Sequence, residues 1–98
     1  MSRNSGDFSI RGATVWPGLS KLIEECGELV QVAGKLIETH GEVRHWDGSN
    51  LRDRITEEIG DVMAACYFVM RHCKIDPTVV ARRCNDKLSQ YEKWKEGR

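Results

Sequence analysis

The stretch LIEECGELVQVAGKLI, residues 22–37, decides the fold, because its apolar side chains recur at alternating steps of three and four residues. That spacing places them in one stripe along an α-helix. The period extends beyond the stretch on both sides, so we predict a helix from about Pro17 or Leu19 to about Thr39. Gly41 follows the last periodic turn and suits the position just after a helix end.

The stretch ITEEIGDVMAACYFVM, residues 55–70, has the same helical period. We predict a second helix over about Leu51–Cys73, with Asn50 or Ser49 as the residue that caps its first turn. Residues 40–50, between the two helices, contain two glycines and no period. This segment is therefore expected to be a loop.

A third helix should start at Asp76-Pro77 and run to about Trp94, because Asp suits the cap and Pro suits the first helical position. No stretch is convincing as a β-strand. The predicted fold class is all-α: an antiparallel helical hairpin plus a third helix, forming a four-helix-type bundle on oligomerisation. Residues 1–16 are polar with few apolar side chains, so we expect an irregular N-terminal arm before a helical domain over residues 17–98.

Length and charge exclude several classes of protein. A chain of 98 residues suits one domain, and its small core would need a partner subunit to cover long helices. The 15 basic and 15 acidic side chains give zero net charge, so we expect no general attraction to nucleic acid polymers or membranes. No apolar run approaches the roughly 18 residues of a membrane span. The four cysteines form no C-x-x-C pair, and three of them fall on apolar stripes, which predicts free, buried thiols in a reducing compartment.

An acidic motif occurs twice in the chain. EECGEL begins at Glu24, and EEIGDV begins at Glu57. Each copy carries an interior glycine, Gly27 or Gly60, although glycine within a helix costs up to about 1 kcal/mol relative to alanine. The matched glycines indicate that a ligand or the opposing helix comes close at both places.

The repeated acids share one flank of their helices. Glu25 and Glu28 lie beside the apolar stripe of the first helix, and Glu58 and Asp61 lie at nearly the same offset on the second. Side chains three apart on a helix are neighbours. When the stripes pack antiparallel, the four carboxylates are expected to converge.

Converging carboxylates repel one another, and a divalent cation relieves that repulsion. Oxygen ligands favour Mg²⁺, with Mn²⁺ as the alternative, and Mg²⁺ completes its shell with water and substrate phosphates. The competing interpretation is a solvated acidic face, which a single E-x-x-E favours. The doubling of the motif, with matched glycines, favours the metal site.

At these residues the sequence resembles the MazG-like all-α nucleoside triphosphate pyrophosphohydrolases, whose signature is E-E-x-x-E on one helix and E-x-x-D on the next. The signature reads here as Glu24 to Glu28 and Glu58 to Asp61, and the resemblance covers roughly residues 16–95. It implies cleavage between the α and β phosphates to a monophosphate and pyrophosphate, as nucleotide-pool house-cleaning in the cytoplasm. It also implies a homodimer or homotetramer.

The resemblance implies roles for five acids. Four would be Mg²⁺ ligands: Glu25, Glu28, Glu58 and Asp61. Glu24 would help to position the attacking water, so Glu24 and Glu25 are the catalytic candidates. Two alternatives stay open: a phosphoribosyl-ATP pyrophosphatase-like enzyme, and a non-catalytic helical interaction module.

Five further side chains are candidates for substrate binding. A triphosphate needs cations besides the metal, and Lys87 on the third helix is the first candidate, with Asn85 beside it and Lys21 one turn before Glu25. Solvated lysines would look the same. Trp16 and Trp46 have faces on which a base can stack, although Trp16 equally suits packing at a helix end.

Overall fold

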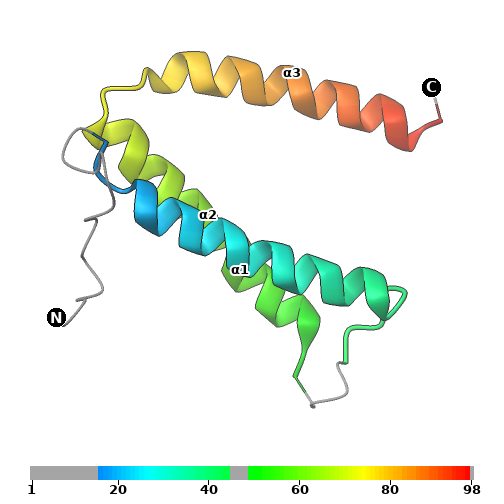
Figure 1. The fold of residues 1–98 in the computed structure, drawn as a ribbon. Coiled ribbons are helices and arrows are strands. Elements are labelled where there is room, and N and C mark those ends of the chain that lie inside the picture. The colour runs from blue at the N-terminus through cyan, green and yellow to red at the C-terminus, as the bar shows by residue number, and fades with distance from the viewer. Residues whose placement is uncertain (1–15, 45–48, 98) are drawn as a thin grey trace, which may run out of the picture.

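The computed structural model describes residues 16–44 and 49–97, and within them the chain forms three α-helices and no strand. The helices are α1 (Leu19–Glu38), α2 (Leu51–His72) and α3 (Pro77–Lys95). Figure 1 shows α1 and α2 side by side and antiparallel, with α3 set apart from them. The predicted all-α class and the hairpin are confirmed. The predicted arm lies almost entirely outside the described residues.

Local signals account for the helix ends. The side chain of Asn50 accepts a hydrogen bond from the N–H of Asp53 at 3.1 Å and starts α2. Asp76 accepts the N–H of Thr78 at 2.8 Å and starts α3. After α1, Gly41 adopts a left-handed φ of 86° and donates its N–H to the Leu36 carbonyl at 2.8 Å.

The start of α1 is held tightly against the end of α2. Gly18 precedes α1 with a φ of 95°, and a Cβ at this position would lie 2.7 Å from Cδ1 of Phe68. Only glycine fits both the backbone conformation and the space. Because the helices are antiparallel, placing Gly18 opposite Phe68 also places Glu25 opposite Asp61 and Glu28 opposite Glu58.

The core of the hairpin is small, and its apolar surface is wider than one partner helix can cover. Only four apolar side chains are buried in the described part of the chain: Val32, Leu51, Ala65 and Val69. On α1, the next apolar row stays open, with Ile23 65%, Val30 69% and Ile37 79% exposed. On α2, Ile59 and Met63 are about half exposed. A helical repeat of 3.6 residues puts these five side chains on one side of the hairpin, which we call the apolar face.

Helix α3 contributes nothing to this core. None of its residues is buried, and its apolar row, which includes Leu88 and Tyr91, is exposed. The radius of gyration is 16.4 Å, whereas a compact domain of this length has about 13 Å. The apolar row of α3 is therefore not covered by the rest of the described chain.

The cysteine and hydropathy expectations can also be compared with the fold. All four cysteines are free, as predicted, but the expectation that they are buried is wrong: Cys26 and Cys84 are exposed and the other two are only part-buried, because the apolar stripes are wider than the packed seam. Among the described residues, none of the helices has the length and apolar character needed to cross a membrane.

Replacing Gly18 with alanine tests the contact that sets the register. Gly41→Ala is the matched control, because Gly41 also has a positive φ but has open space around it. We expect Gly41→Ala to lose about 1–2 kcal/mol of unfolding free energy from the left-handed backbone alone. Gly18→Ala should lose a further ~1–3 kcal/mol from overpacking against Phe68. Urea unfolding followed by circular dichroism measures both, and equal losses would show that Phe68 simply swings aside.

Candidate metal centre

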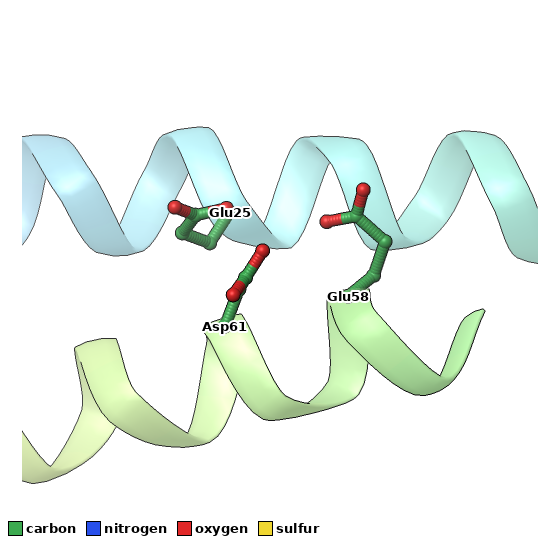
Figure 2. A group of neighbouring side chains, drawn as sticks. All are labelled: Glu25, Glu58 and Asp61. Atoms are coloured by element: carbon green, nitrogen blue, oxygen red, sulfur yellow. The ribbon is translucent and has the colours of Figure 1, made fainter. Parts of the chain in front are cut away.

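Three carboxylates meet between α1 and α2. Glu25 projects from α1, and Glu58 and Asp61 project from α2 toward it, as Figure 2 shows. One oxygen from each side chain lies within 4.8 Å of the others. Glu25 and Glu58 are half-buried, and Asp61 is exposed. The group is therefore held by two helices but open on one side.

The register of the hairpin explains why these acids meet. Glu58 and Asp61 are three residues apart and so lie on neighbouring turns of one face of α2. Glu25 and Glu28 have the same spacing on α1, which runs in the opposite direction. Glu28 is near enough for its charge to act on Glu25 and Glu58, although it is not in the group of three. The structure thus brings together three of the four expected ligands and keeps the fourth nearby.

The group is electrostatically strained without a cation. Loss of surrounding water raises the pKa of the Glu58 carboxyl above its ordinary value of 4.5, and the charges of Glu28 and Asp61 raise it further. Desolvation likewise raises the pKa of Glu25, again with contributions from Glu28 and Asp61. Lys21 opposes the rise at Glu25 only in part. The protein therefore concentrates negative charge that its own cations do not neutralise.

The residues present fit a hard divalent cation. Oε1 of Glu58 is shielded from solvent and accepts no hydrogen bond from any residue that the structure describes. Such an atom is costly unless a ligand or proton satisfies it. Two oxygens on one Mg²⁺ lie at most about 4.2 Å apart, twice the usual bond length, so the three carboxylates need only small side-chain movements. Glu25, Glu58 and Asp61 would hold such an ion, with Glu28 beside them.

Glu24 and Lys21 lie at the outer edge of this group. Lys21 donates a hydrogen bond to Glu24 from one turn earlier in α1, and the two side chains form an ion pair. The Glu24 side chain is about half exposed. Its expected role in positioning water stays a prediction.

A cavity of about 220 Å³ adjoins the carboxylates. It is lined by Gly18, Lys21, Glu25, Asp61, Ala64, Ala65 and Phe68, and we call it the hairpin cavity. Sequence reasoning missed Phe68, which lies two turns from Asp61 and so shares its side of α2. That spacing was the available signal, but it marks a cavity wall only once the register with α1 is known.

The other candidate residues are not gathered here within one chain. Lys87 and Asn85 lie on α3, away from the hairpin, and Lys87 donates to Gln90 at 3.4 Å. Trp16 is 46% exposed and does not line the hairpin cavity. Trp46 lies outside the described residues. The binding roles of these four stay predictions.

The two motif glycines have open space around them. A Cβ at Gly27 or Gly60 would meet nothing within 4 Å among the described residues. The interpretation that the opposing helix approaches them is therefore wrong, because both positions face away from the partner helix. The alternative, a ligand, remains.

Comparison with known proteins agrees with this geometry. The family model described as the MazG nucleotide pyrophosphohydrolase domain matches residues 18–95. That segment runs from the glycine before α1 to the last residue of α3 and includes every carboxylate of the site. No curated protein and no solved structure matches the chain.

Glu58→Gln should stabilise the protein without metal and weaken its response to Mg²⁺. A folded-state pKa above 4.5 means that the native state binds a proton more tightly than the unfolded state. Stability is then lost as the pH rises from about 4.5 through the folded pKa. In EDTA near neutral pH, the variant should therefore have the higher Tm, and the difference should vanish below the ordinary carboxyl range.

Adding Mg²⁺ at about a hundred times its Kd should stabilise the wild type by about 2.7 kcal/mol, and the variant by clearly less. Glu57→Gln is the matched control, because Glu57 lies outside the group of three. It should keep the full Mg²⁺ response. Thermal unfolding with and without Mg²⁺ measures this stabilisation. An equal stabilisation of all three proteins by Mg²⁺ would argue against a metal centre at these carboxylates.

Proposed function

The chain belongs to the MazG nucleotide pyrophosphohydrolase family, and we propose that it is a Mg²⁺-dependent hydrolase of nucleoside triphosphates. In this proposal it cleaves the bond between the α and β phosphates and releases a nucleoside monophosphate and pyrophosphate. The observation that carries the proposal is the group of Glu25, Glu58 and Asp61, whose oxygens converge from two helices. Family membership indicates the class of reaction. The carboxylates can bind a metal ion that in turn binds the triphosphate.

In this mechanism the carboxylates are the ligands of the metal ion. Glu25, Glu58 and Asp61, with Glu28, would hold the cation, which when bound would neutralise phosphate charge and lower the pKa of a bound water. Glu24 accepts a hydrogen bond from the attacking water and orients it toward phosphorus. Lys21, which lines the hairpin cavity, offers positive charge to the phosphates. Water attacks directly, so no covalent enzyme intermediate forms.

The assembled enzyme is a homodimer or homotetramer in which hairpins pair into a four-helix-type bundle. The apolar face gives the physical reason, because Ile23, Val30 and Ile37 are largely exposed in one chain. A helix such as α3, which has no buried residue in the described structure, is only marginally stable in water by itself. A second copy covers both surfaces. Basic side chains outnumber acidic ones on α3, and the reverse holds on α1 and α2, so the charges of the two parts are complementary.

Assembly also gives a role to the α3 candidates. Lys87 and Asn85 cannot reach the carboxylates of their own chain in the observed arrangement. In the bundle, α3 of a second copy brings this basic helix toward the phosphates. The biological role that we propose is nucleotide-pool house-cleaning in the cytoplasm, a reducing compartment that suits the free thiols.

Removing one ligand should abolish turnover but not folding. Asp61→Asn and Glu28→Gln should each lower kcat/KM by about a hundredfold or more, the size expected when a group that stabilises transition-state charge is lost. Glu57→Gln should stay within about twofold of wild type, since Glu57 is outside the group. Pyrophosphate release from a panel of triphosphates and phosphoribosyl-ATP, with and without Mg²⁺, measures this.

Circular dichroism is the control for folding in these variants. Loss of helix in Asp61→Asn would point to a structural role for the carboxylate. Absence of turnover of every compound by the wild type would favour the non-catalytic interaction module. Faster turnover of phosphoribosyl-ATP than of any triphosphate would favour the phosphoribosyl-ATP pyrophosphatase-like enzyme.

A charge on the apolar face should break the assembly. Val30→Glu places a carboxylate where the second copy packs, so we expect a lower molar mass in size-exclusion chromatography with light scattering. Gln31→Glu is the matched control, because Gln31 is its exposed neighbour on the polar side of α1. It should leave the molar mass unchanged. Equal masses for wild type and Val30→Glu would exclude the apolar face as the interface.

A further inference from the structure

We propose that the hairpin cavity takes the base and sugar of the nucleotide and that Phe68 is a stacking surface that accepts any base. The inference rests on the proposed function and deepens it by naming the substrate range. It predicts an enzyme that recognises the triphosphate and an aromatic ring, with little discrimination among bases.

The cavity is continuous with the metal centre. Glu25 and Asp61 belong both to the group of carboxylates and to the cavity wall. Phe68 lines the same cavity seven residues after Asp61, which is about 10 Å along a helix. A nucleotide whose phosphates lie at the carboxylates therefore extends along the hairpin toward Phe68.

Phe68 is fixed in place from two sides. The backbone of Gly18 lies so close that a methyl group there would be 2.7 Å from the Phe68 ring. On the other side, the centroids of the Phe68 and His72 rings are 4.3 Å apart. The residue is nevertheless 37% exposed. A ring held rigid and left partly open to a cavity is prepared for stacking, because little conformational entropy remains to be lost on binding.

The rest of the wall offers little that could read the edge of a base. Ala64 and Ala65 have no polar side-chain atoms, and the described lining contains no amide or hydroxyl side chain. The carbonyl of Gly18 already accepts the N–H of Leu22 at 2.9 Å. The ammonium of Lys21 donates to Glu24. Stacking tolerates every base, whereas discrimination by factors of 10⁴ or more requires hydrogen-bonding groups.

The test is steady-state kinetics of pyrophosphate release with ATP, GTP, CTP, UTP and dTTP in Mg²⁺. The wild type should vary in kcat/KM by no more than about a hundredfold across the bases. Phe68→Leu, which keeps apolar volume but removes the ring, should raise every KM by about tenfold and change kcat little. Tyr67→Leu is the matched control, since Tyr67 is the adjacent aromatic residue and does not line the cavity.

Inorganic tripolyphosphate separates stacking from a general structural effect. It carries the phosphates without a base, so its inhibition constant should be unchanged in Phe68→Leu. Ala64→Leu is a second variant that fills the cavity from an exposed position. It should also raise KM for nucleotides and leave tripolyphosphate inhibition unchanged.

Three outcomes would overturn the inference. They are a preference above a thousandfold for one base, equal effects of Phe68→Leu and Tyr67→Leu, and a tripolyphosphate inhibition constant that rises with KM. Any of these leaves the pyrophosphohydrolase proposal intact, because turnover is still observed. Absence of turnover by the wild type would instead refute the proposed function and, with it, the inference.

Discussion

The antiparallel register of α1 and α2 is the constraint on which the site depends. Gly18 and Phe68 approach too closely for any side chain at position 18, which fixes one pair of opposing residues. The other opposing pairs follow from this one, because each residue forward along α1 is opposite one residue backward along α2. Glu25 therefore meets Asp61. A slip of one residue would rotate each position by about 100° and remove the carboxylates from the seam.

The seam that gathers the acids is also the weak part of the fold. Positions that could have held apolar side chains hold Glu25 and Glu58, whose pKa values are raised by desolvation and by neighbouring acids. Charge in such a place opposes folding until a cation binds. Only four apolar side chains are buried in the described chain. In so small a core, the proposed metal ion and the proposed second copy would each add stability, and the wide apolar face offers the surface for the second copy.

Local physics explains what the sequence could predict. Helix ends follow from caps such as Asn50 and Asp76, and the meeting of Glu25 with Asp61 follows from equal offsets beside two stripes. Phe68 could not be identified, because a cavity wall depends on the register, and the register depends on one close contact. The prediction that the opposing helix approaches Gly60 was wrong for a related reason. The apolar stripe of each helix is wider than the surface that the other helix covers, so the helical period alone could not show which side of the stripe is packed. Among the described residues, α3 makes too little contact with α1 and α2 for a sequence pattern to specify how it packs.

The division of surfaces on the hairpin reconciles assembly with substrate access. Met63 and Phe68 are five residues apart on α2, so they point about 140° away from each other. One lies on the apolar face and the other lines the hairpin cavity. On α1, Val30 and Glu25 are separated in the same sense. A second copy can therefore cover the apolar row without closing the cavity or the carboxylates. In the proposed assembly, the same two helices would pair with a second copy on one side and hold a nucleotide on the other.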